Sequence, residues 1–187
     1  MVETEAMGCE RSDSALVAAA KDGDRAAFAQ LLERHYGRIH RIAWRSIGSP
    51  EDAEDIAQDI CCALVTKLVG FRGDAKFTTW LTGVALNACR DHLRRRQSQN
   101  RLMQGAANLA ALTPGPDGRD LYRRSWIASD LAALDDTLRE TVILVAGEEM
   151  SHAEAAEVLG VAESTVSWRM HQARRKLKEE RSDEDGS

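Results

Sequence analysis

The sequence predicts an all-α protein built from two small helical domains, and three observations support this prediction. Of the 187 residues, only 5% are aromatic and only 3 are proline, whereas Ala, Leu, Glu and Arg, which favour helices, are abundant. Apolar residues recur at three- and four-residue spacing in two long segments. Between these segments lie Pro114-Gly115-Pro116 and Asp117-Gly118, which are typical of turns and linkers. Two helical units joined by a linker are therefore expected.

The domain boundaries follow from the alternation of patterned and unpatterned segments. We expect helical domains over residues 14–97 and 129–179, joined by a flexible linker over 98–128. A linker of about thirty residues is longer than an ordinary loop within a domain, so it would let the two domains change their relative arrangement. Residues 1–13 and the acidic tail, 180–187, are polar and are expected to be disordered.

Charge and composition exclude several classes of protein. The chain has 25 Lys and Arg against 30 Asp and Glu, and this net charge of −5 does not by itself indicate a nucleic-acid binder, although a sum hides local patches. No apolar run approaches the about 18 residues of a membrane span, and the N-terminus lacks the apolar core of a secretory signal. The four cysteines show no paired spacing. We therefore expect a cytoplasmic protein without a disulfide framework or membrane insertion.

The first domain contains at least three long predicted helices. Asp24 can cap the first, whose apolar stripe comprises Ala27, Phe28, Leu31, Leu32, His35, Ile39 and Ile42. Gly48 interrupts the pattern, and Ser49 followed by Pro50 is typical of a helix start. That second helix should run to about Val69, and a third should begin near Thr78 or Thr79.

The predicted second helix is strongly acidic at its start. Five carboxylates lie within positions 51–59, while Ala53, Ile56, Ala57, Ile60 and Leu64 form an apolar side. Acidic residues in the first turn favour the helix dipole, but five such charges repel one another. A docking surface for a basic partner protein explains the remaining charge. A metal cluster is the weaker alternative, because neither a histidine nor a glycine-bearing loop accompanies these carboxylates.

The third helix carries a basic segment. Five arginines and one aspartate lie between Arg90 and Arg101, downstream of Phe77 and Trp80. Aromatic rings beside a basic helix are typical of single-stranded DNA binding, where the rings stack on bases and the cations neutralise phosphates. The structural alternative is that the rings belong to the core and the arginines only solubilise a helix end, and for Trp80 alone core packing is the favoured interpretation.

The second domain predicts a helix-turn-helix. Ser151 and Glu154 form a capping-box signature, Gly160 can end that helix, and a second helix follows over 163–178. In this helix Val166, Met170, Ala173 and Leu177 fall on one side, with hydroxyls, an amide and arginines on the others. An exposed face of this kind suits base edges and phosphates. A helical hairpin in a bundle, with a cationic helix end complementing its own dipole, remains the alternative.

The sequence gives little support for catalysis. Phosphate-binding glycine loops and the GxSxG and HExxH signatures are absent from the sequence. Cys89 and His92 are three residues apart, but two ligands do not make a zinc site, and Cys61 and Cys62 point in different directions on a helix. We expect a protein that is not an enzyme and that needs no cofactor or metal.

Two segments together resemble a known family. Residues 27–96, which include DAEDIAQD and FTTWLTGVALNACRDHLRRR, resemble conserved region 2 of bacterial RNA polymerase sigma factors of the extracytoplasmic-function (ECF) group. Residues 134–179, which include LGVAESTVSWRMHQARRKL, resemble region 4 of the same group. The two segments cover about two-thirds of the chain, in the family's order and spacing.

This resemblance implies a set of partners and site residues. The acidic helix would dock on the clamp helices of the polymerase beta-prime subunit, and region 4 would meet the beta flap, while promoter DNA and an anti-sigma factor would be the other partners. The residues implied in core polymerase binding are Asp52, Asp55, Gln58 and Asp59. Those implied in melting and reading the promoter −10 element are Asp74, Ala75, Lys76, Asn87, Arg90, Arg94 and Arg95, with a flipped base held near the first three. Those implied in reading the −35 element are Thr165, Ser167, Trp168, Arg169, His171, Gln172 and Arg174.

The sequence also departs from the family in a few places. Trp168 stands where a small or basic residue is expected, Ala162 is a poor N-cap, and Cys61-Cys62 replaces a bulky apolar pair. These departures leave the promoter sequence open. The alternatives to a sigma factor are a stand-alone helix-turn-helix regulator, which leaves the acidic helix unexplained, and a helical interaction protein, which leaves the outward basic helix unexplained.

Overall fold

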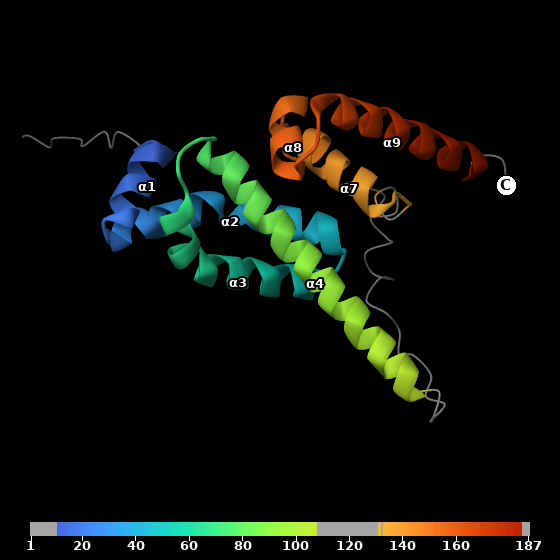
Figure 1. Cartoon of the computed structure of the whole chain (residues 1–187), viewed down its shortest axis with the longest axis horizontal. Helices are drawn as coiled ribbons and strands as arrows, with labels where there is room; N and C mark the ends of the chain where they lie inside the picture. The colour runs from blue at the N-terminus through green and yellow to red at the C-terminus, as the bar shows by residue number, and fades with distance from the viewer. Residues whose placement is uncertain (1–10, 108–130, 132, 185–187) are drawn as a thin grey trace, which may run out of the picture.

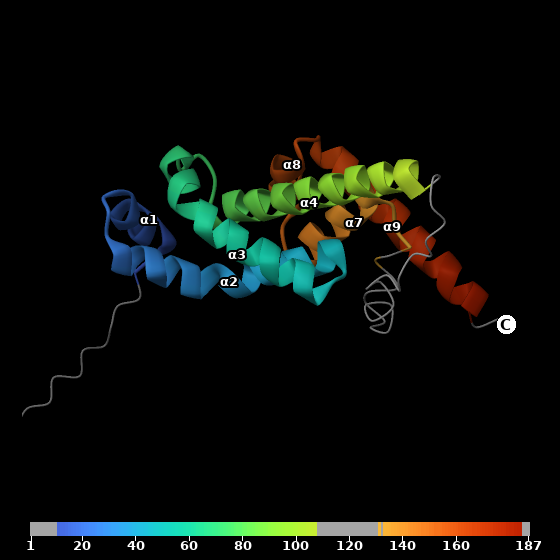
Figure 2. The same cartoon turned by 90° about the horizontal axis from the view of Figure 1, so that it is seen from below.

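A computed structural model describes residues 11–107, 131 and 133–184 of the chain. Every regular element within these residues is helical, which confirms the predicted all-α class (Figure 1). Among the described residues, the N-terminal part contains four α-helices and a 3₁₀ turn, and the C-terminal part contains three α-helices and a π-helical turn. Two views at right angles show the C-terminal helices lying along one side of the long helix α4 (Figures 1 and 2).

The N-terminal domain consists of α1 (Asp13–Lys21), α2 (Arg25–Ile47), α3 (Pro50–Lys67), a 3₁₀ turn η1 (Leu68–Gly70) and α4 (Phe77–Ala107). The predicted caps are confirmed: the Asp24 carboxylate accepts hydrogen bonds from two backbone amides of α2, and the Ser49 hydroxyl accepts one from α3. Gly48 has a φ of 79°, a left-handed conformation in which glycine avoids a steric penalty, and it separates α2 from α3. Helix α4 begins at Phe77, one residue before the predicted start.

The core of this domain lies between α2, α3 and α4. The apolar stripe predicted for α2 is buried at Ala27, Leu31, His35, Ile39 and Ile42. Helix α3 contributes the five apolar residues that the sequence pattern placed on its inner side, namely Ala53, Ile56, Ala57, Ile60 and Leu64. Because these side chains are removed from water on folding, they fix which face of α3 is left outside.

The C-terminal domain consists of α7 (Asp136–Val142), the π-helical turn η2 (Ile143–Gly147), α8 (His152–Leu159) and α9 (Glu163–Glu184). The capping box is confirmed, because the Ser151 side chain accepts from the Glu154 amide while the Glu154 carboxylate accepts from the Ser151 amide. Gly160 adopts a left-handed conformation with a φ of 66° between α8 and α9. The predicted helix-turn-helix is therefore present.

The predicted linker and the predicted tail each start inside a helix, which differs from the boundaries expected from sequence. Helix α4 continues to Ala107, so residues 98–107 are helical rather than linker. This segment lacks proline and carries helix-favouring Gln, Leu, Met and Ala, so nothing in it ends the helix. Helix α9 likewise continues to Glu184, into the range predicted as a disordered tail. The remainder of the predicted linker, 108–128, and most of the N-terminal segment, 1–10, lie outside the described residues.

Candidate functional site

The outer face of α3 is acidic and exposed. Asp55, Gln58 and Asp59 are all exposed, whereas the apolar residues between them are buried. Among the described residues, neither Asp55 nor Asp59 forms a hydrogen bond or an ion pair. The structure therefore places the carboxylates of these two residues in water, on the surface that the sequence predicted for polymerase docking.

Asp52 differs from the other members of this predicted set. Its carboxylate lies 3.2 Å from Arg96 Nη1 and 3.8 Å from His92 Nε2, both on α4. Glu54, on the same helix, accepts a hydrogen bond of 2.7 Å from the Tyr36 hydroxyl, which lowers the pKa of Glu54 and raises that of Tyr36 to about 12. Asp52 thus holds α3 against α4, and Glu54 holds it against α2. Of the predicted docking residues, Asp55, Gln58 and Asp59 are the ones left open to a partner protein.

The aromatic residues at the start of α4 belong mainly to the core. Phe77 is buried and Trp80 is half-buried, and their ring centroids lie 5.7 Å apart. Phe71 contacts both rings, at 5.7 and 5.1 Å respectively. The packing therefore supports the interpretation that these rings belong to the core rather than stack on DNA bases. The exposed part of this segment is formed by its cations.

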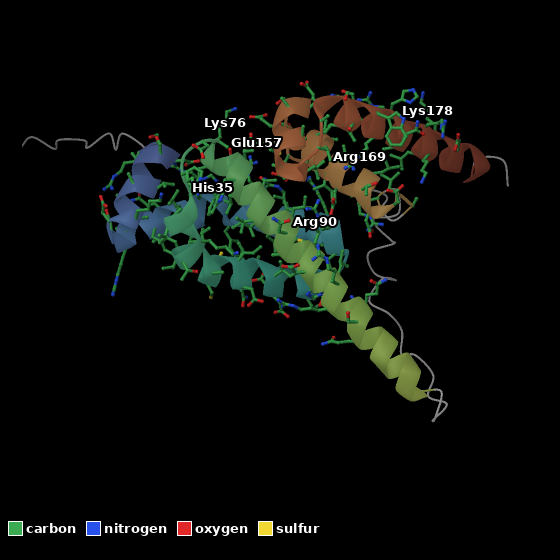
Figure 3. All side chains as sticks on the ribbon, in the orientation of Figure 1. His35, Lys76, Arg90, Glu157, Arg169 and Lys178 are labelled. Carbon is green, nitrogen blue, oxygen red and sulfur yellow. The ribbon has the colours of Figure 1, made fainter. Side chains whose placement is uncertain are left out.

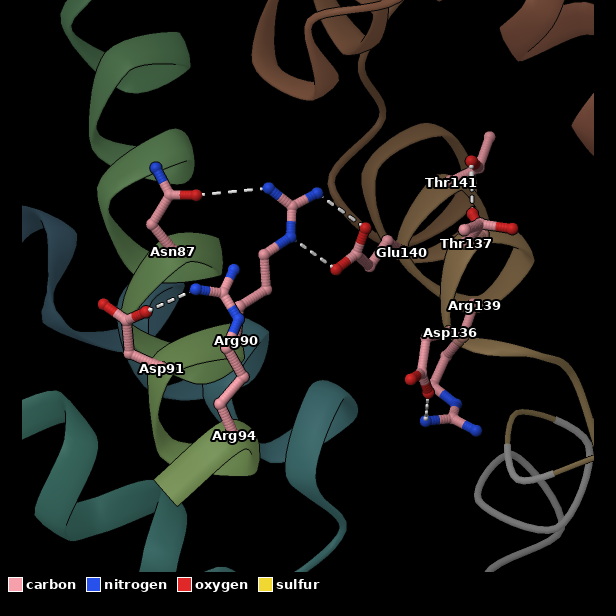
Figure 4. Close-up of polar contacts among 9 residues, drawn as sticks. All are labelled: Asn87, Arg90, Asp91, Arg94, Asp136, Thr137, Arg139, Glu140 and Thr141. Atoms are coloured by element: carbon pink, nitrogen blue, oxygen red, sulfur yellow. Dashed lines mark hydrogen bonds and ion pairs between the residues drawn. The ribbon is translucent and has the colours of Figure 1, made fainter. Parts of the chain in front are cut away.

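The predicted −10 residues divide into two groups. Asp74, Asn87, Arg94 and Arg95 are exposed, and Ala75 is half-buried. Lys76, which is also exposed, and the half-buried Arg90 pair with carboxylates of the C-terminal domain. Figure 3 labels both cations, and Figure 4 shows the Arg90 contact in close-up. The sequence did not identify either carboxylate, Glu140 or Glu154, as a partner of these cations.

Arg90 forms a bidentate ion pair with Glu140 of α7. Its Nε lies 2.6 Å from Oε1, its Nη2 lies 2.7 Å from Oε2, and its Nη1 donates to Asn87 at 3.1 Å (Figure 4). Lys76 Nζ lies 2.7 Å from the Glu154 carboxylate, and this hydrogen bond, with those from Ser151, lowers the pKa of Glu154 to about 2. Two cations assigned by resemblance to promoter DNA are thus bound to carboxylates of the other domain.

The exposed face of α9 agrees with the predicted pattern. Val166, Met170 and Ala173 are buried and Leu177 is half-buried, which confirms the inward stripe. The predicted −35 residues at the other positions are exposed (Ser167, Trp168, His171 and Arg174) or half-buried (Thr165, Arg169 and Gln172). Trp168 is 60% exposed, unusually high for so large an apolar side chain, so it is available to a partner.

His152, which the sequence analysis did not predict as a site residue, adjoins this face. His152, at the start of α8, places Nδ1 2.8 Å from the Ser167 hydroxyl of α9. The contact joins the two helices of the helix-turn-helix at their exposed edge. The only sequence feature that could have indicated this contact is that a histidine opens α8, the helix before the recognition helix.

Cys62 and Cys89 should differ sharply in reactivity. Cys62 is exposed on α3, whereas Cys89 is buried on α4 and burial raises the pKa of its thiol to about 12. At pH 8 we expect iodoacetamide to alkylate Cys62 within minutes and to leave Cys89 unmodified while the chain is folded. Peptide mass spectrometry with and without denaturant measures this difference, and alkylation of Cys89 at the rate of Cys62 in the native chain would contradict the packing of α4. Cys9 lies outside the described residues.

Within residues 11–107, 131 and 133–184, no three or more His, Cys, Asp or Glu side chains gather as a metal-binding group. In the same part of the chain, the helices are either too short or too polar to cross a bilayer.

Comparisons with known proteins agree on one family. Residues 31–99 match the family model of sigma-70 region 2, and residues 126–177 match that of sigma-70 region 4. The chain is 38% identical over 170 residues to the ECF RNA polymerase sigma factor SigM of Mycobacterium tuberculosis, covering 90% of this chain and 84% of SigM. It is 40% identical over 174 residues to the RNA polymerase sigma factor NccH of Alcaligenes xylosoxydans xylosoxydans, covering 88% and 92% of the two chains.

Solved structures of similar proteins give the same answer. The chain superposes on CnrH, in its complex with the cytosolic domain of CnrY, with a TM-score of 0.67 and 34% identity over 91% of this chain and 97% of CnrH. It superposes on the sigma factor RpoE of Bartonella quintana, in complex with the anti-sigma factor NepR, with a TM-score of 0.65 and 25% identity over 81% and 94% of the two chains. The chain belongs to the extracytoplasmic-function group of RNA polymerase sigma factors, with region 2 formed by the N-terminal domain and region 4 by the helix-turn-helix domain.

Proposed function

We propose that this chain binds core RNA polymerase through the outer face of α3 and directs transcription initiation from its own set of promoters. The observation that supports this proposal most is that one chain combines an exposed acidic face on α3 with an exposed, hydrogen-bonding face on α9. A stand-alone DNA-binding regulator needs only the second. A sigma factor needs both, because it must link polymerase to promoter.

Each predicted surface then has a separate task. Asp55, Gln58 and Asp59 would meet basic residues of the beta-prime clamp helices, and the region 4 domain would meet the beta flap. The segment from Asp74 to Arg95 would recognise and open the −10 element, where single strands with exposed bases become available. The face of α9 that carries Trp168 and Arg174 would lie in the major groove of the −35 element. Binding energy alone drives these steps, so the proposal requires no catalytic group.

An anti-sigma factor is the expected regulator. The structures of CnrH and of RpoE that this chain resembles are complexes with the cytosolic domain of CnrY and with the anti-sigma factor NepR, respectively. We infer that this chain is also held inactive by a protein that covers its polymerase-binding surfaces. Because polymerase and promoter DNA are in the cytoplasm, this is where we place its activity.

Reconstituted transcription tests the proposal directly. The purified chain is mixed with core RNA polymerase and genomic fragments of its own host, and the 5′ ends of transcripts are mapped. We expect discrete start sites that are missing with core alone, and a shared sequence about 10 and 35 base pairs upstream of them. Absence of initiation together with absence of core binding in gel filtration would overturn the proposal and favour the stand-alone regulator.

A further inference from the structure

The two domains are joined by a buried carboxylate of the C-terminal domain. Glu148, directly after the π-helical turn η2, has a side chain that is only 1% exposed. It lies 3.1 Å from Arg45, 3.5 Å from Arg38 and 3.6 Å from Arg41, all on α2. A buried charge is costly unless it is paired, and here three guanidinium groups of the other domain supply the pairing. Separating the domains would break these ion pairs, and water would then have to solvate the Glu148 carboxylate and the three guanidinium groups separately.

The backbone beside Glu148 takes part in the same joint. Arg45 Nη1 donates to the carbonyl oxygen of Gly147 at 2.7 Å. A Cβ atom at Gly147 would lie 2.7 Å from this nitrogen, so any larger residue would push the Arg45 guanidinium out of place. Because the guanidinium is the movable end of the Arg45 side chain, it can shift to make room, and the ion pairs of Glu148 remain the main contact of the joint.

An apolar contact runs alongside the ion pairs. Leu86 of α4 is 1% exposed, and it is buried among C-terminal residues that include Leu144, Met150 and Val166 rather than in the core of its own domain. Gly83, one turn earlier, would place a Cβ 3.9 Å from Val158 of α8. Helix α4 thus packs against α2 and α3 on one side and against α8 on the other (Figures 1 and 2), and Leu86 joins the apolar cluster that includes Leu144 of η2.

The closed joint places carboxylates on the cations assigned to promoter DNA. Glu140 offers Arg90 two oxygens at 2.6 and 2.7 Å, the arrangement in which a guanidinium also binds two oxygens of a phosphate group. The Oε1 atom of Glu154 lies 2.7 Å from Nζ of Lys76 and pairs with its ammonium group. The Arg90 side chain is only 29% exposed in this pair and is closed to a DNA strand while its pair with Glu140 persists. The Lys76 side chain is paired but stays 76% exposed, so its charge is compensated rather than covered.

We infer that the free chain is autoinhibited by its own C-terminal domain: Glu148 holds the two domains together, and Glu140 and Glu154 take the place of promoter phosphates on Arg90 and Lys76. This inference rests on the proposed function, in which these two cations contact the −10 element. Docking on polymerase, which needs the two domains at separate sites, would then supply the energy that opens the joint.

The joint itself is tested without DNA by energy transfer within the full chain. Dyes are attached to Cys62 and to a Glu163→Cys variant, both exposed positions in different domains, with Cys9 and Cys61 replaced by serine and buried Cys89 retained. We expect Glu148→Gln, Glu140→Gln and their combination to lower the transfer efficiency. Gly147→Ala, which keeps every charge, should lower it less, because the Arg45 side chain can move aside. Asp136→Asn is the matched control, because it breaks a 3.0 Å ion pair with Arg139 that stays within α7. Unchanged transfer in the double variant would overturn the inference.

Masking of the cations is tested by DNA affinity. The same variants are titrated with a forked −10 fragment by fluorescence anisotropy, and circular dichroism verifies that their helix content is unchanged. We expect the opened double variant to bind about tenfold more tightly than the wild type, because a larger share of the molecules is competent to bind. If the domains separate but the affinity stays at the wild-type value, Glu140 and Glu154 do not mask the cations and the inference is wrong.

A reversible cross-link separates this inference from the proposed function. Gly83→Cys with Val158→Cys joins the two domains where they touch, and initiation with core polymerase is measured before and after reduction. We expect initiation only from the reduced chain. Equal initiation from the oxidised chain would overturn the autoinhibition while supporting the sigma role, and failure of the wild-type chain to initiate would overturn the sigma role whatever the energy transfer reports.

Discussion

Replacing Asp55 and Asp59 together by lysine is expected to weaken binding to core RNA polymerase by about 100-fold. Both carboxylates are exposed on α3, and neither is used in an ion pair within the described part of the chain. Against a basic docking surface, the reversal replaces two attractive contacts by two repulsive ones. Since both positions lie on the outer face, the buried side of α3 keeps its packing and the melting temperature should change little.

A matched double variant makes this result specific to the face of α3. Asp22→Lys with Glu33→Lys reverses two exposed charges at the end of α1 and on α2, and so changes the net charge by the same amount. Fluorescence anisotropy of labelled chain with core polymerase, repeated at several salt concentrations, measures both variants. The wild type and this control should lose affinity as salt screens the attractive contact, whereas the α3 variant should lose less affinity or gain some, because salt also screens its repulsive contacts. Equal affinity of the α3 variant and the control would refute docking through this face.

The acidic helix also shows how far periodicity can predict a site. The pattern correctly divided α3 into a buried side, such as Ile56 and Ile60, and an exposed side that includes Asp55. It could not separate Asp55 from Asp52, because that distinction depends on where α4 crosses α3 and brings Arg96 within 3.2 Å of Asp52. Helical spacing determines which face a residue occupies, but the partner that crosses that face comes from tertiary packing.

The contacts between the domains lay beyond sequence reasoning for a related reason. Glu148 and its partners on α2 are about a hundred positions apart, and residues 108–130 between them lie outside the described part of the chain. A signal did exist in the spacing of Arg38, Arg41 and Arg45, which puts three cations on one face of α2 and calls for an anionic partner. That partner was unidentifiable, since the sequence offers 30 acidic residues and no rule for choosing among them.

The recognition helix was the better predicted part because its assignment needed only local information. The buried positions Val166, Met170 and Ala173 follow from helical spacing, and the capping box and Gly160 fix where the preceding helix starts and stops. What remained open was the consequence of Trp168, which is 60% exposed on that face. On the proposed function, this exposed indole would either contact thymine methyl groups in the major groove or give the chain an unusual −35 preference, and the mapped promoters distinguish the two.

Replacing Arg174 by alanine is expected to lower initiation from −35-dependent promoters by about tenfold, and Arg169→Ala should have an effect of similar size. Arg174 is exposed and Arg169 half-buried on the outward side of α9, where a guanidinium can bind a phosphate or two acceptors of a guanine. Run-off transcription from one promoter with an intact −35 element and from one with a scrambled element measures the effect, with core binding measured in parallel. Arg25→Ala, which removes an exposed arginine at the start of α2, is the control and should leave both promoters unchanged.

The loss of initiation at the intact promoter, compared with the loss at the scrambled one, shows whether the arginines of α9 read the −35 sequence. If its arginines read the −35 element, their removal should lower the strong promoter towards the scrambled one and leave the scrambled one nearly unaffected, because the contact is already lost there. If they only neutralise phosphates, both promoters should weaken by a similar factor and the salt dependence should fall with them. A variant with unchanged initiation on both promoters would mean that this face of α9 does not meet DNA, and the surface formed by Trp168 and Arg174 would then require a protein partner instead.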